Sequence, residues 1–89
     1  MEMQNVQYKV HPETISSEVE NQVVLLQYES GVYFTLNEVG TNIWQLIEEE
    51  KTHQQIINEL QRMYDVNEER LNQDVLALVK QLKEKGLIS

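Results

Sequence analysis

The sequence has no cysteine, and it has only one proline and three glycines among its 89 residues. The absence of cysteine excludes both a disulfide framework and a metal site with thiolate ligands. No apolar run approaches the roughly 18 residues that a membrane-spanning helix needs, and the N-terminal segment lacks the apolar core of a signal peptide. The length predicts one small domain spanning residues 1–89, with residues 1–5 disordered and the cytoplasm as the default compartment.

Basic residues are also scarce, because fifteen Asp and Glu face seven Lys and Arg for a formal net charge of −8. This balance disfavours nucleic acid and anionic membranes as partners, since binding to DNA depends on cations that displace condensed counterions. It is compatible with a basic or neutral partner. It also fits a small protein whose acidic surface simply keeps it soluble.

The most regular pattern lies in residues 23–36, VVLLQYESGVYFTL, where β-branched, aliphatic and aromatic side chains flank the break Glu29-Ser30-Gly31. A two-residue period on both sides of a glycine-containing turn predicts a β-hairpin. Gly31 is expected at the left-handed position that closes a three-residue loop.

A further strand is predicted at residues 6–10, which also alternate and which Pro12 ends because proline cannot donate to a sheet. Residues 13–22 are polar apart from Ile15 and Val19, and we interpret them as a connection. The sequence therefore predicts a sheet of three antiparallel strands, formed by residues 6–10 and the hairpin.

From Glu38 onward the apolar period changes from two to 3.6, which predicts helices. Asn37 is expected to cap the first helix, which ends in the acidic run 48–50, and Thr52 is expected to cap the second. The apolar side of the first helix is predicted to be Val39, Ile43, Trp44, Leu46 and Ile47. That of the second is predicted to be Ile56, Ile57, Leu60, Met63 and Tyr64.

The third helix has the most complete pattern, with Asn67 as its cap and Gly86 as its terminator. Its core stripe is predicted to be Leu71, Val75, Leu78, Val79 and Leu82. Three strands followed by three helices predict an α+β fold. The arrangement is winged helix-turn-helix-like, with a three-stranded antiparallel sheet packed against three helices.

The sequence offers no catalytic or metal-binding constellation. His11 and His53 are far apart, and neither has a second ligand at suitable spacing on a common face, whereas a zinc site needs three or four convergent ligands. The glycines are too scattered for a phosphate-binding loop. We therefore expect no enzyme activity, no metal and no cofactor.

DNA binding is a second hypothesis, because helix-turn-helix proteins share this order of helices. The N-terminal part of the third helix would then meet base edges. Here that part carries Glu68, Glu69 and Asp74, which would face phosphates with the wrong charge. Nucleic acid is therefore not the expected partner.

The strand at residues 32–36, VYFTL, contains neither Lys nor Pro, the residues that commonly protect a sheet edge. An apolar, uncharged edge suits an added strand from an extended peptide, which gains main-chain hydrogen bonds there. The N-terminal strand or a second copy of the chain would cover the same edge equally well. The residues alone leave both interpretations open.

Taken together, these segments resemble the PqqD-like proteins, which are peptide-modification chaperones also called RiPP recognition elements. The resemblance covers residues 6–89. It rests on the strand pair, on Leu36-Asn37 followed by Gly40, on Ile43-Trp44-Leu46-Ile47, and on the D-V-x6-L-x3-G-L-I pattern from Asp74 to Ile88.

This resemblance implies a three-stranded sheet packed on three helices, with no catalytic activity of its own. It implies that the leader segment of a ribosomally made precursor peptide binds as an added strand on the third strand, beside the third helix. The strand residues expected to bind are Val32, Tyr33, Phe34, Thr35 and Leu36. The helix residues, chosen by helical spacing, are Asp74, Leu78, Gln81 and Lys85.

A free-standing acidic domain of this length is similar to the leader-recognition proteins of lasso-peptide pathways. The resemblance then implies a separate leader peptidase and an ATP-dependent cyclase as partners. A pyrroloquinoline-quinone pathway chaperone working with a radical-SAM enzyme is the alternative, and an accessory to a sactipeptide maturase is a third.

Overall fold

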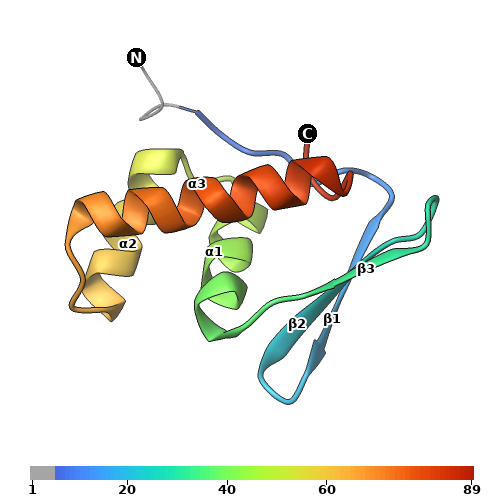
Figure 1. Cartoon of the computed structure of the whole chain (residues 1–89), viewed down its shortest axis with the longest axis horizontal. Helices are drawn as coiled ribbons and strands as arrows, with labels where there is room; N and C mark the ends of the chain where they lie inside the picture. The colour runs from blue at the N-terminus through green and yellow to red at the C-terminus, as the bar shows by residue number, and fades with distance from the viewer. Residues whose placement is uncertain (1–5) are drawn as a thin grey trace.

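The computed structural model describes residues 6–89, in which three strands precede three helices (Figure 1). The elements are β1 (Thr14–Val19), β2 (Gln22–Gln27), β3 (Val32–Thr35), α1 (Glu38–Glu48), α2 (His53–Met63) and α3 (Glu68–Glu84). The predicted α+β fold is confirmed. The prediction of disorder for residues 1–5 lies outside the described residues.

The sheet has the order β1-β2-β3 with both pairs antiparallel, so the predicted hairpin is confirmed as β2 and β3. Gln27 pairs with Val32, which leaves a loop of residues 28–31, one longer than predicted. Gly31 has the expected positive φ of 79°. The buried amide of Gln27 supports the turn by accepting the Ser30 N–H at 3.0 Å.

The first strand is not where the sequence predicts it. Residues 6–10 form no sheet strand and make two isolated bridges, Gln7 to Thr52 and Val10 to Ile88. The strand is β1, inside the predicted connection. Its Ile15 and Val19 are 47% and 54% exposed. Because so little of this edge strand is buried, its sequence does not need to alternate between apolar and polar residues.

The β1–β2 turn contains no glycine that would mark it in the sequence. Glu20 and Asn21 both adopt positive φ, at 52° and 70°. Two successive left-handed residues form the tight turn that suits a two-residue hairpin, but such turns usually carry Asn-Gly or Asp-Gly.

The predicted caps of α1 and α2 are confirmed. Asn37 Oδ1 accepts the Gly40 N–H at 2.8 Å, and Thr52 and Gln55 form a reciprocal capping box. On α2 the prediction for Met63 is wrong, because this side chain is 51% exposed. Met63 is the last residue of the helix.

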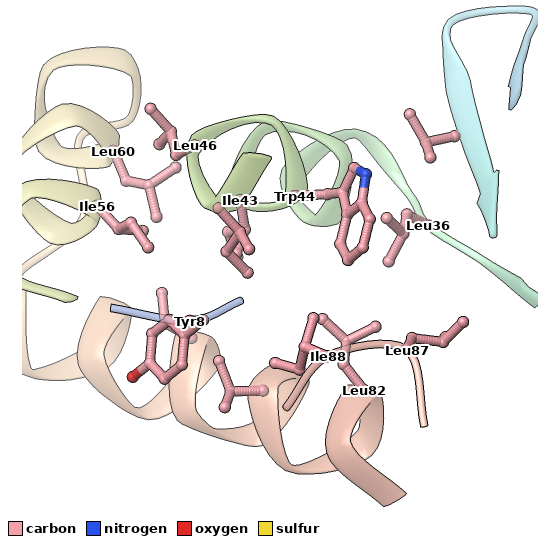
Figure 2. Packing of buried hydrophobic residues seen from close by; sticks show 14 of the residues in the cluster. Tyr8, Leu36, Ile43, Trp44, Leu46, Ile56, Leu60, Leu82, Leu87 and Ile88 are labelled. Atoms are coloured by element: carbon pink, nitrogen blue, oxygen red, sulfur yellow. The ribbon is translucent and has the colours of Figure 1, made fainter. Parts of the chain in front are cut away.

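The core lies between the helices and the inner face of the sheet, and it includes both ends of the described chain. Figure 2 shows Leu36 pointing toward the indole ring of Trp44, with Leu87 and Ile88 folded back over the C-terminal end of α3. Gly86 has a φ of 72°, as its predicted role of helix terminator requires. The chain thereby returns two apolar residues to the core.

The segment before β1 is fastened to the helices by a buried polar contact. The Tyr8 hydroxyl lies 2.8 Å from His53 Nδ1, and His53 Nε2 contacts Asn72 Oδ1 of α3. In one tautomer His53 accepts from the Tyr8 hydroxyl at Nδ1 and donates to Asn72 Oδ1 from Nε2. Burial raises the pKa of Tyr8 above its ordinary value.

Candidate functional site

β3 forms one edge of the sheet, because β2 is its only neighbour in the strand order of the described chain. Residues 6–10, which the sequence offered as a cover for this edge, bridge to Thr52 and Ile88 instead. β3 contains no Lys or Pro, so none of the usual protecting residues lies within it.

The direction of each main-chain group on β3 follows from one hydrogen bond and the register. Leu36 N–H donates to Val23 O at 2.8 Å. In an antiparallel pair, residues that bond to the partner strand alternate with residues that do not. The main-chain groups of Val32 and Phe34 share the parity of Leu36 and face β2, so the N–H and C=O groups of Tyr33 and Thr35 point away from the sheet. We call these outward groups the β3 edge.

The side chains of β3 alternate between two environments. Val32 and Phe34 are half-buried on the helix side, and Phe34 packs against the core. Tyr33, 67% exposed, and Thr35 lie on the opposite face. A strand added to the β3 edge would alternate in the same way, so every second side chain of it would face the helices.

A groove of about 380 Å³ lies between the start of α1 and the middle of α3, just past the end of β3. This volume is within the range of small-ligand pockets in proteins, so the groove can take side chains of a bound segment. Its lining residues, hereafter the groove, are Asn37, Val39, Gly40 and Ile43 on one side, and Asp74, Ala77, Leu78 and Gln81 on the other.

Local structure holds the α1 wall of the groove in place. Asn37 caps α1 through the Gly40 N–H. A Cβ on Gly40 would lie 3.2 Å from Leu36 Cδ2 and 3.3 Å from Asn37 Oδ1. Glycine therefore allows the first turn of α1 to close tightly on the end of β3.

The other wall is α3, which crosses the molecule from the α2 side to the sheet (Figure 1). Its C-terminal end reaches β3, since Lys85 Nζ lies 5.5 Å from the centroid of the Phe34 ring. Its middle lies beside Asn37, because Asp74 and Gln81 line the groove with that residue. α3 therefore runs alongside β3 and its continuation, in the opposite chain direction.

The structure brings together most of the residues that the sequence singled out. Asp74, Leu78 and Gln81 line the groove, and Lys85 lies against Phe34. Leu36 is only 2% exposed, so its side chain belongs to the core beneath the site.

Five residues that line the groove are not predicted from the sequence: Asn37, Val39, Gly40, Ile43 and Ala77. Ala77 carried a usable signal, because it lies three positions from Asp74 on the same helical face. Val39 and Ile43 carried no such signal, because residues of a buried helix face have the same spacing. Val39 is in fact half-buried.

Within residues 6–89 there is no group of three or more His, Cys, Asp or Glu side chains that could hold a metal ion. His11 Nδ1 accepts the Glu13 N–H at 3.0 Å, and His53 is held between Tyr8 and Asn72. None of the helices described is long and apolar enough to span a membrane.

Comparison with known proteins finds a matching family and two similar solved structures. Residues 22–88 match the family described as Coenzyme PQQ synthesis protein D (PqqD). TbiB1 in complex with the TbiA(beta) leader peptide is 31% identical with a TM-score of 0.87, over 91% of this chain and 94% of that chain. Lasso peptide synthetase B1 complexed with the leader peptide is 27% identical with a TM-score of 0.87, over 94% and 99%. No curated protein matches the sequence.

Proposed function

The chain belongs to the PqqD family, and we propose that it is a non-catalytic module that captures a leader peptide by strand addition. The leader is the N-terminal segment of a ribosomally synthesised precursor peptide. It pairs with the β3 edge, and the module presents the precursor to separate maturation enzymes. The two similar structures, both of leader-peptide complexes, support this proposal.

The observation that carries the proposal is the outward direction of the Tyr33 and Thr35 main chain, beside a groove. An added strand gains hydrogen bonds to these N–H and C=O groups, each with a net value of about 0.5–1.5 kcal/mol. Antiparallel pairs outnumber parallel ones, so we take the peptide to run antiparallel to β3.

The proposed binding residues act in three ways. Tyr33 and Thr35 bind through the main chain, and Leu36 supports the strand from the core. The side chains that face the peptide on its helix side are Val32 and Phe34 of β3, with Asp74, Leu78, Gln81 and Lys85 of α3.

The pathway we favour is lasso-peptide biosynthesis, in which a separate leader peptidase and an ATP-dependent cyclase would be the partners. Similarity to lasso peptide synthetase B1 with its leader peptide supports this choice. The alternative is a chaperone of pyrroloquinoline-quinone synthesis that works with a radical-SAM enzyme. The family description supports the alternative.

A titration of the isotopically labelled chain tests strand addition. Peptides are synthesised from the N-terminal halves of the short open reading frames beside its gene, with a scrambled version of each as the control. We expect one unscrambled peptide to shift the amide signals of β3, the start of α1 and the groove face of α3. Shifts confined to α2 and β1 would contradict the proposal.

A further inference from the structure

Two oppositely charged side chains mark the ends of the proposed site. Asp74 lines the groove beside Asn37, and Lys85 lies over the Phe34 ring at the far end of α3. Both belong to the helical face that also carries Leu78 and Gln81, because these four positions recur at intervals of three and four.

Neither charge is neutralised by an ion pair within the described part of the chain. There the one ion pair is that of Arg62 with Glu59, at 3.3 Å on the surface of α2. Lys85 is half-buried in a chain with fifteen acidic residues, yet its amine lies over an aromatic ring. Within residues 6–89 the site therefore keeps a negative end and a positive end available to a ligand.

The distance between these ends sets the spacing of complementary charges on a bound strand. Asp74 and Lys85 are eleven positions apart, which corresponds to about 16 Å along a helix. A strand rises about 3.4 Å per residue, so this length spans about five residues. Side chains on one face of a strand are separated by an even number of residues. Because long charged side chains can reach inward and shorten the required span, we expect a separation of four residues.

The polarity of the strand follows from the direction of α3. Lys85 lies at Phe34, and Asp74 lies beside Asn37. A peptide that runs antiparallel to β3 therefore has its N-terminal part near Asp74 and its C-terminal part near Lys85.

We propose that the site selects peptides by the order of their charged residues. The selected peptide has a Lys or Arg beside Asp74 and an Asp or Glu four residues later beside Lys85. This inference rests on the proposed function, because it concerns the specificity of the same site. Two charge pairs at the surface, each of modest strength, are expected to favour this order over its reverse by about tenfold in Kd.

Selection from a displayed library of random 15-residue peptides tests the inference. The targets are the wild-type chain, the double variant Asp74→Lys/Lys85→Glu, and the control Lys80→Glu, whose exposed lysine lies on another face of α3. We expect the wild type and Lys80→Glu to enrich the basic-then-acidic order and the double variant to enrich its reverse. The neutral variant Lys85→Gln, which tests the same point if the double variant does not fold, should lose only the acidic preference.

The outcomes separate the two levels of the proposal. If the enriched peptides pair with β3 but show no charge order, selection by charge order is wrong and strand addition is still supported. The same conclusion follows if the double variant enriches the same charge order as the wild type. If the wild type enriches no peptide, both strand addition and selection by charge order are contradicted.

Discussion

Tyr33 and Thr35 differ from the neighbouring residues of β3 in where their main chain points. The N–H of Leu36 is committed to Val23, and the alternation of an antiparallel pair leaves Tyr33 and Thr35 facing outward. Loss of one outward donor should therefore affect binding far more than folding.

The substitution Thr35→Pro removes such a donor, and proline is tolerated at an edge where the N–H does not serve the sheet. We expect peptide affinity to fall about tenfold or more, with a change of less than about 1 kcal/mol in the free energy of unfolding. Thr35→Val, which keeps the N–H, is the matched control. Calorimetric titration and denaturant unfolding measure the two quantities, and equal affinities of the proline and valine variants would argue against main-chain recognition.

Tyr8 gives a prediction at the residue scale that concerns stability alone. Burial raises the pKa of this phenol in the folded chain above its ordinary value of about 10. The folded state thus holds the proton more tightly, so this contribution to stability is complete below that value and is lost as the pH rises through the folded pKa.

Tyr8→Phe should remove part of the fall in unfolding free energy at alkaline pH. At neutral pH it should cost about 1–3 kcal/mol, because His53 Nδ1 loses its hydrogen-bond partner. Tyr33→Phe is the control, since Tyr33 is exposed. Denaturant unfolding from neutral to alkaline pH checks this, and identical pH profiles for the Tyr8→Phe variant and the wild type would contradict it.

The helices and strands that the sequence predicts correctly either bury a face of regularly spaced apolar residues or begin with a capping residue. The β2–β3 hairpin and the three helices were predicted because burial enforces their periods and because Asn37, Thr52 and Asn67 mark the helix starts. β1 was missed because most of it is exposed and its turn uses Glu20 and Asn21 in place of glycine. Residues 6–10 alternate without joining the sheet, since Tyr8 is drawn into the core.

The cap of α1 has a double role, because Asn37 and Gly40 also line the groove. Asn37→Ala should cost about 0.5–2 kcal/mol of stability and should also weaken peptide binding by loosening that wall. Asn67→Ala removes the same kind of cap from α3, whose first turn does not line the groove. The control should therefore lose similar stability and keep its affinity. Equal affinities for the two variants would count against a role for α1 in the site.

At the scale of the whole molecule, the groove is the feature that sequence patterns did not reveal in full. Asp74, Leu78 and Gln81 were predicted from helical spacing, but the α1 wall depends on how α1 packs against α3. Half-buried positions such as Val39 have the spacing of core residues. Only the packed structure separates an apolar residue that fills the core from one that lines an opening.

The overall charge of −8 gives a prediction about partners. The first turn of α3 carries Glu68 and Glu69, so a helix that would enter a DNA groove presents carboxylates to phosphates. We expect no retention of the chain on immobilised duplex DNA even at low salt, where electrostatic binding is strongest. Retention that falls steeply with added salt would favour a DNA-binding protein instead.

Hydrogen exchange of single amides in β3, measured with and without a saturating leader peptide, tests strand addition at this edge. In the free chain we predict fast exchange at Tyr33 and Thr35 and slower exchange at Phe34, which bonds to β2. With the peptide bound, Tyr33 and Thr35 should become protected while Phe34 changes little. A peptide that binds without slowing exchange at Tyr33 and Thr35 would contradict strand addition at β3.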